Sequence, residues 1–321
     1  MNYLITGGAG FIGAHLCRRL LNENAKITII DDLSTGRWDN IASLSSNPNL
    51  RVIIASADDS VLIEREMAQH DFVFHLASAV GVRLIVDRPV ESIQRIIRPT
   101  EVIVDACARY RKPILLTSTS EVYGRSEKVP FCEDADVVMG PSCKRRWAYA
   151  TAKALDEFYL LAHHYQSSLP IYIVRLFNTV GPYQTGQYGM VLPRFVEAAL
   201  KNAPIFVYGD GKQKRCFCSV YDVVEGLIRI SQTARASGTV INLGSNEEVS
   251  IENLAQRVVK LCQSRSTIQY LSYDEAYGPG FDDMQRRVPS LKRAEELIQW
   301  NPQFNLDDII CQVIEYKKHK I

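Results

Sequence analysis

The sequence predicts an α/β chain with a doubly wound parallel sheet and a smaller C-terminal lobe. Over the first 180 residues, short apolar runs alternate with longer amphipathic stretches, which is typical of βαβ units and a parallel sheet. A glycine-rich stretch directly follows the first apolar run. After residue 180 the strand-like runs become sparser, which indicates a second, differently built lobe.

The individual elements follow from length and periodicity. Apolar runs of four to seven residues fit strands that are buried on both faces of a sheet, whereas a 3.6-residue repeat indicates helices. We predict that the chain crosses back to the sheet around residues 205–243. The predicted strands are 3–6, 27–31, 51–55, 72–77, 113–118 and 171–177, and the predicted helices include 11–22, 101–110 and 148–165.

Charge, hydropathy and cysteine usage narrow the function classes. The chain has 37 Lys and Arg against 36 Asp and Glu, a formal charge of +1, which gives no support for nucleic acid or an anionic membrane as partner. No apolar run approaches a membrane span, and the first residues lack the features of a signal peptide. The eight cysteines are scattered without zinc-site spacing, so we expect reduced thiols, no metal and a cytoplasmic location.

The glycine-rich stretch 7-GGAGFIG-13 lies between a predicted strand and a predicted helix. In this context glycines allow a tight turn, a close approach of backbone N–H groups to a pyrophosphate, and close helix–strand packing. A structural glycine turn is the alternative. We predict a Rossmann-type dinucleotide site formed by Gly7, Gly10, Phe11, Ile12 and Gly13.

Acidic residues after later strands extend this predicted site. Asp31 ends the second strand, where a carboxylate accepts from ribose hydroxyls and repels a 2′-phosphate, so NAD is favoured over NADP. Asp32 follows it, and Asp58 and Asp59 are placed to reach the adenine amine. Ala77 ends the fourth strand and completes the predicted cofactor site. We therefore assign residues 1–180 to an NAD-binding domain and 181–321 to a smaller substrate-binding domain.

Tyr149 and Lys153 are four residues apart on a predicted helix and share one face. A tyrosine normally titrates near ~10, and a neighbouring ammonium together with a cationic nicotinamide would lower that pKa. The phenolate could then take a proton from a hydroxyl whose carbon loses a hydride. Taken alone, the pair also fits a packed tyrosine beside a surface lysine.

The stretch 117-TSTSEVYG-124 adds hydroxyl residues at the end of a strand. With 7-GGAGFIG-13, 149-YATAK-153, 175-RLFNTVGP-182 and 207-VYGDGKQKRCF-217, the chain resembles the extended short-chain dehydrogenase/reductases of the NAD-dependent epimerase/dehydratase family, which act on nucleotide sugars. The resemblance covers essentially the whole chain. It implies oxidation of the sugar at C4 by a catalytic set of Thr119, Tyr149 and Lys153. It also implies a homodimer formed through helices around 94–110 and 148–165.

Ser120 and Glu121 distinguish reactions within this family. Ser120 cannot act as the carboxylic acid that the 4,6-dehydratases place there, and Thr-Ser-Glu resembles the UDP-glucuronate decarboxylases. The resemblance implies that UDP-glucuronate is oxidised and decarboxylated to UDP-xylose or the 4-keto pentose, with catalytic Glu121 orienting the sugar and its carboxylate. A UDP-sugar 4-epimerase acting on a UDP-glucuronate or UDP-glucose type of substrate is the alternative. A non-catalytic NAD-binding regulator is an alternative of another class.

Further residues are expected to hold the substrate. Arg215 is expected to bind the diphosphate or assist proton return, although it could instead belong to a solvated basic run. Ser120 and Asn178 are expected to contact the substrate, and Arg287 its diphosphate. Arg145 and Arg146 are expected to be surface or rim charges, with contact to a carboxylate as the alternative. In 96-IIRPT-100, Ile96 stands where the family resemblance would place an asparagine near the nicotinamide, and Pro99 stands at a glycine.

Overall fold

The computed structural model describes residues 1–78, 88–186, 190–277, 284 and 286–319. Its centre is a seven-stranded parallel sheet with strand order β11-β6-β5-β4-β1-β2-β3. The predicted fold class, an α/β fold with a doubly wound parallel sheet, is confirmed, and the six predicted strands lie in this sheet. The strands are β1 (Asn2–Thr6), β2 (Lys26–Asp31), β3 (Leu50–Ile54), β4 (Phe72–His75), β5 (Ile114–Thr119), β6 (Ile171–Leu176) and β11 (Thr239–Leu243).

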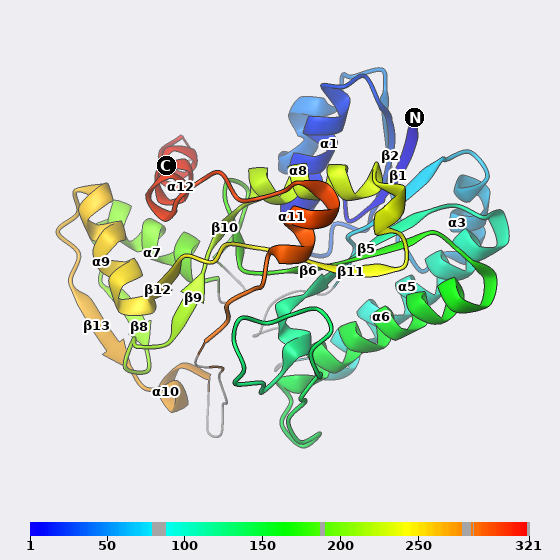
Figure 1. Ribbon diagram of the computed structural model, residues 1–321. Coiled ribbons are helices and arrows are strands. Elements are labelled where there is room, and N and C mark those ends of the chain that lie inside the picture. Colours follow the sequence, from blue (N-terminus) through cyan, green and yellow to red (C-terminus); the bar gives the residue numbers. More distant parts are fainter. Residues whose placement is uncertain (79–87, 187–189, 278–283, 285, 320–321) are drawn as a thin grey trace.

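Helices cover both faces of the sheet (Figure 1). One apolar core joins the sheet to α1 (Phe11–Leu21), α8 (Val220–Ser231) and α11 (Lys292–Ile298). A second core joins the opposite face to α3 (Ser60–Met67), α5 (Pro89–Tyr110) and α6 (Trp147–Ser167). Strand residues alternate between these two cores, as Leu4 and Ile5 do, because successive side chains of a strand point to opposite faces.

Helix α5 is much longer than the predicted helix 101–110, because it begins at Pro89 and continues through Pro99. A proline at the first helical position costs no hydrogen bond, since that N–H has no intrahelical partner. An interior proline removes one bond of the helix, and the helix predicted from periodicity, 101–110, begins only after Pro99. The Thr100 hydroxyl donates to the Ile96 carbonyl at 2.9 Å within this turn.

The C-terminal lobe has its own apolar core, formed mainly by α7 (Val191–Leu200), α9 (Ile251–Cys262) and α12 (Leu306–Lys318). Short strand pairs complete it. The pairs are β8 (Ile205–Tyr208) with β13 (Ile268–Leu271), β9 (Lys214–Cys216) with β12 (Glu248–Ser250), and β7 (Thr179–Val180) with β10 (Cys218–Ser219). After β10 and α8 the chain returns to the main sheet, where β11 is the edge strand and pairs with β6. The small helices α2 (Trp38–Ile41) and α10 (Tyr273–Tyr277) lie in loops.

None of the helices within the described ranges is long and apolar enough to cross a membrane.

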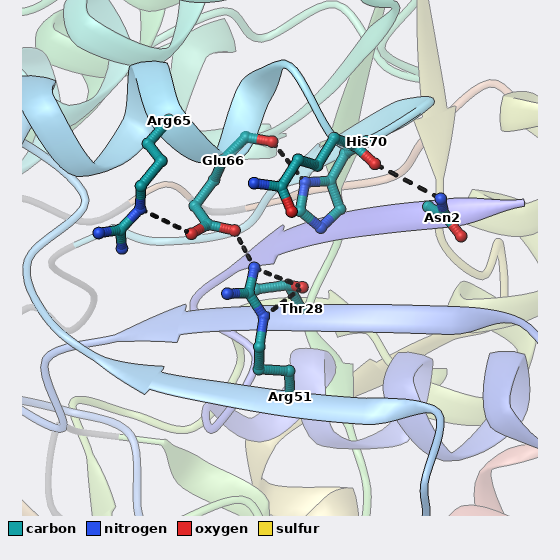
Figure 2. Close-up of polar contacts among 7 residues, drawn as sticks. Asn2, Thr28, Arg51, Arg65, Glu66 and His70 are labelled. Atoms are coloured by element: carbon teal, nitrogen blue, oxygen red, sulfur yellow. Dashed lines mark hydrogen bonds and ion pairs between the residues drawn. The ribbon is translucent and has the colours of Figure 1, made fainter.

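A buried carboxylate ties α3 to the edge of the sheet (Figure 2). Glu66, with a fully buried side chain, pairs with Arg51 of β3 and with Arg65 at 3.3 Å. The Glu66 carbonyl oxygen lies 2.6 Å from Nδ1 of His70, and Asn2 of β1 donates to the Gln69 carbonyl at 3.4 Å. These contacts fix α3 against the β3 edge, on the side away from the C-terminal lobe.

A second buried ion pair joins α6 to β6, the strand next to the β11 edge of the sheet. Arg175 of β6 makes a two-pronged contact with Glu157 of α6, from Nε to Oε1 at 3.0 Å and from Nη2 to Oε2 at 2.7 Å. Both side chains are 6% exposed. Glu157 also accepts from the Ser118 hydroxyl of β5, and the guanidinium lies 4.7 Å from the ring centroid of Tyr123. Two neighbouring strands and one helix therefore meet at a single carboxylate.

We expect Arg175→Met to lower the free energy of unfolding by about 3–5 kcal/mol, because it leaves Glu157 buried without its cation. The matched control is Arg257→Met, whose ion pairs with Glu247 and Asp307 are half-exposed and are worth about 0–1 kcal/mol. Urea denaturation of both variants measures the difference. Equal losses would show that the Arg175 pair does not hold α6.

Candidate active site

A cavity of about 1070 Å³ lies at the carboxyl ends of the sheet strands, between the sheet and the C-terminal lobe. Open parallel sheets bind their ligands at this edge. Its walls run from the glycine-rich loop, through the end of β5 and the start of α6, to β8 and β9 of the lobe. All of the residues predicted to contact the cofactor or the substrate line this cavity, except Asp59 and Lys153, and Lys153 lies buried beneath Tyr149's helical turn.

The glycine-rich loop is packed too tightly for side chains. Gly7 has a φ of +71°, and a Cβ on it would lie 2.7 Å from the backbone nitrogen of Ala77. A Cβ on Gly13 would lie 2.3 Å from the Gly7 carbonyl oxygen. Helix α1 begins at Phe11 after Gly10, which provides no side-chain cap, so the first N–H groups of the helix face the cavity end. This bare helix start fits the pyrophosphate of a dinucleotide.

Asp31 at the end of β2 lies beside this loop. Its carboxylate accepts from the N–H groups of Ala9 and Leu33, each at 2.9 Å. Burial raises the pKa of Asp31, and these two hydrogen bonds work in the opposite direction. The neighbouring Asp32 pairs with Arg95 of α5 at 3.2 Å. The Asp31 carboxylate therefore lies at the end of β2, beside the glycine-rich loop, where the ribose of a dinucleotide is expected.

The two acids after β3 have different places. Asp58 lines the cavity. Asp59 caps α3 instead, because its carboxylate accepts from the Leu62 N–H at 3.0 Å. The expectation that Asp59 reaches the adenine is therefore wrong, since an aspartate directly before a helix satisfies an otherwise unpaired N–H.

Tyr149 lies in the first turn of α6, with its ring beside Ile96, Ile97 and Ala152. Its pKa is raised, chiefly by burial and then by the negative charge of Glu121, while a hydrogen bond with Thr119 lowers it. Lys153, which was expected to lower this pKa, is not among these influences. The Lys153 ammonium instead pairs with Asp156 at 3.0 Å.

Glu121 lies in the turn Ser120–Tyr123 that follows β5. Thr119 caps this turn, accepting from the Glu121 N–H at 3.2 Å. The Glu121 carboxylate pairs with Arg146 at 3.2 Å and with Arg287 at 2.5 Å. Arg146 is buried, so its assignment as a rim charge is wrong, whereas Arg145 is exposed. A largely buried carboxylate needs cationic partners, and the sequence around Arg146 carries no signal for this pairing.

The remaining predicted substrate residues gather on the lobe side of the cavity. Arg215 is buried in β9, with Nη1 donating to the Lys214 carbonyl at 2.8 Å, so it does not belong to a solvated basic face. Asn178 donates to the Cys216 carbonyl at 2.9 Å, which links the end of β6 to β9. Ser120 is buried at the start of the turn that follows β5.

Sequence reasoning missed several residues at the far end of the cavity. The Arg194 guanidinium lies 4.0 Å from the ring centroid of Tyr208. Gln213 and Tyr273 line the same end. The stretch 207-VYGDG-211 was visible as a motif, but only the structure places its tyrosine on the wall. In the part of the chain that the structure describes, no three His, Cys, Asp or Glu residues form a metal-binding group.

The bare glycine loop, the carboxylate at the end of β2 and the Tyr149–Lys153 helix together have the arrangement expected of a dinucleotide-binding α/β enzyme. Residues 3–244 match the NAD dependent epimerase/dehydratase family, and the chain belongs to this family. The resemblance read from the sequence motifs is thereby confirmed.

Two relatives and one solved structure show where the chain lies within the family. It is 37% identical over 314 residues to a UDP-N-acetyl-alpha-D-glucosaminuronate decarboxylase of Bacillus cytotoxicus, covering 98% of this chain and 96% of the relative. It is 32% identical to UDP-glucuronic acid decarboxylase 1 of Danio rerio, covering 98% and 72%. The UDP-glucuronic acid 4-epimerase of Bacillus cereus, solved with UDP-glucuronic acid and NAD, matches with a TM-score of 0.89 at 27% identity, covering 100% of both chains.

We expect Asp31→Asn to weaken NAD binding by roughly tenfold or more, because an amide replaces the charged acceptor for the ribose hydroxyls, and a hydrogen bond to a charged group is worth about 1.5–3 kcal/mol. The matched control is Asp59→Asn, since asparagine caps a helix as well as aspartate. Isothermal titration with NAD compares the two variants. Unchanged affinity in Asp31→Asn would remove this carboxylate from the cofactor site.

Proposed function

We propose that the protein is an NAD-dependent decarboxylase of a UDP-linked hexuronate. The observation that carries this proposal is the placement of Glu121 between Arg146 and Arg287, two residues after Thr119 and next to Tyr149. One carboxylate between two guanidinium groups leaves a net positive charge at the sugar end of the cavity. Such a site favours a substrate that brings a carboxylate of its own.

The chemistry begins with oxidation of the sugar at C4. NAD, when bound, supplies the hydride acceptor and later the hydride donor. Tyr149 takes the proton of the C4 hydroxyl, and Thr119 donates a hydrogen bond to the same oxygen. The product is a β-keto acid. Its C5–carboxylate bond breaks, carbon dioxide leaves, and the electron pair delocalises into the C4 ketone as an enolate, which then takes a proton at C5.

The chain's charged residues act mainly by positioning. We assign Glu121 to holding the sugar and fixing the two arginines, because it contacts both. Arg146 and Arg287 are then placed to meet the substrate carboxylate before it is lost. Arg215, with Asn178 beside it, is placed on the lobe side to bind the diphosphate. Ser120 offers a hydroxyl to the sugar.

The substituent at C2 of the sugar divides the candidate substrates. UDP-glucuronate carries a hydroxyl there, and UDP-N-acetylglucosaminuronate an acetamido group. The 37% identity with the Bacillus cytotoxicus enzyme favours the second substrate, whereas relatives that act on UDP-glucuronate are 30–32% identical. A 4-epimerase is the alternative reaction, supported by the similar Bacillus cereus structure.

Incubation of the purified protein with each uronate and NAD tests the proposal. We expect mass spectrometry of the nucleotide sugar to show loss of carbon dioxide from at least one of the two. A product of unchanged mass with inverted C4, identified by NMR, would instead establish epimerisation. Absence of any conversion of either uronate would count against both readings.

Two variants separate the steps of the same experiment. Tyr149→Phe removes the base, so we expect at least a hundredfold loss of turnover, in line with about 10²–10⁴ for general base catalysis, with NAD binding retained. Glu121→Gln keeps the base, and we expect it to impair carbon dioxide release far more than NAD binding. Equal impairment of both by Glu121→Gln would make Glu121 a structural residue.

We further propose a homodimer, in a cytoplasmic enzyme whose eight cysteines are all free. Helices α5 and α6 pack side by side (Figure 1), and α6 exposes Leu155, Phe158 and Tyr165 at 50%, 67% and 77%. Three large apolar side chains on one helix favour burial against a partner, and a second copy of the same pair of helices is self-complementary.

We expect Phe158→Glu to shift the protein from dimer to monomer, because it places a charge in the apolar contact. Sedimentation velocity measures the mass, and subcellular fractionation checks the location. The control is Phe206→Glu, at an exposed phenylalanine of β8 in the other lobe. If both variants sediment like the wild type, α6 does not carry the interface.

A further inference from the structure

The helix that carries Tyr149 and Lys153 also carries an acid that the proposed reaction leaves unused. Asp156 lies three residues after Lys153, on the same side of α6. The two side chains are each 2% exposed, and Lys153 Nζ lies 3.0 Å from Asp156 Oδ2. A buried carboxylate in direct contact with the lysine of this site requires an explanation, because burying charge is costly unless it is matched.

We propose that Asp156 is a positioning residue: it fixes where the Lys153 ammonium lies and limits how much of its positive charge acts on the Tyr149 phenol. The inference rests on the proposed function only in so far as Tyr149 is the base. It concerns a contact within the chain and so can be tested without knowing which sugar is bound.

The groups around Asp156 support this role. On α6, Lys153 and Glu157 flank it, and their charges act on it with opposite sign. From α5, the Thr100 hydroxyl favours the charged form of Asp156, although burial remains the largest influence and raises the Asp156 pKa. Ile96, one turn before Thr100, is apolar and buried. Among the described residues, the anionic partner of Lys153 is therefore Asp156, on the same helix.

On the sheet side, the Thr100 hydroxyl contacts a neutral imidazole, that of His75. His75 of β4 lies 3.2 Å from the Thr100 hydroxyl through Nε2 and 2.7 Å from the Thr6 hydroxyl through Nδ1. Burial, assisted by the charge of Lys153, lowers the His75 pKa to about 3. His75 therefore carries no charge near neutral pH, so the charge of Lys153 is balanced by Asp156 and not altered by titration of the histidine.

The sign of the effect on Tyr149 follows from the charges that face it. Glu121 and Asp156 both raise the Tyr149 pKa, after burial, and Thr119 lowers it. Removal of the Asp156 charge takes away one of the two anions and leaves the Lys153 ammonium without its counter-charge. Both changes favour the phenolate, so the phenol loses its proton at lower pH.

Ultraviolet difference titration of NAD-saturated protein tests this directly. The chain has 15 tyrosines, so the Tyr149 contribution is the difference between each protein and the same protein carrying Tyr149→Phe. We expect Asp156→Asn to move this contribution to lower pH by about one unit. The acid limb of the pH–rate profile should move in the same direction wherever a substrate is turned over.

Two further variants keep the experiment decisive. Asp156→Glu retains the charge and should return the titration toward that of the wild type, which a purely space-filling role would not require. Asp105→Asn alters an exposed acid of α5 that accepts from Tyr159, so it should leave the Tyr149 contribution unchanged, although the titration of Tyr159 itself moves. Circular dichroism checks that each variant is folded. If Asp156→Asn does not fold, Asp156→Glu is compared with the wild type instead. A Tyr149 contribution in Asp156→Glu that does not titrate at the wild-type pH would then overturn the role.

An unshifted or upward-shifted Tyr149 titration in folded Asp156→Asn would overturn the proposal. Failure of the protein to convert any UDP-linked uronate would instead overturn the proposed function. Because the titration needs no sugar, these two failures are distinguishable.

Discussion

The ion pair between Arg175 and Glu157 determines where the reactive side of α6 lies. Tyr149, Lys153 and Glu157 are spaced four residues apart and share one face of the helix. Glu157 is held by Arg175 of β6 and by Ser118 of β5, so this face cannot slide along the sheet. The end of β5 and the first turn of α6 are thereby kept together. The contact between Thr119 and Tyr149 depends on this position of α6 along β5.

Electrostatic balance is the second organising constraint of the site. Tyr149 lies between two carboxylates, Glu121 and Asp156, and each of them has cationic partners of its own. Each carboxylate is therefore paired within the chain, and one guanidinium charge is left over at Glu121. A site of this kind stores its positive charge in pairs that an anionic ligand can rearrange, instead of holding it as isolated buried cations, which would be costly.

The sequence was sufficient where a physical requirement leaves few choices of residue. The sheet strands follow from continuous apolar runs, and the glycine loop from contacts that exclude any Cβ at Gly7 and Gly13. Helix α5 is longer than the segment 101–110 that its periodicity predicts, and packing against the sheet and α6 continues the helix through Pro99. Burial of Arg146 was unpredictable because its partner, Glu121, is 25 residues away. The sequence places Asp156 three residues after Lys153, at helical spacing. The ion pair itself is known only from the distance of 3.0 Å between the two side chains.

The chain passes more than once between the two lobes, and this route determines how the molecule unfolds. After β11 in the main sheet, the chain builds β12, α9 and β13 in the C-terminal lobe, returns with α11 to the sheet core, and leaves again to form α12. Neither lobe is a continuous piece that a protease or a truncation could release intact. Denaturation should therefore proceed as one cooperative event, and fragments divided near residue 180 should be recovered as insoluble material.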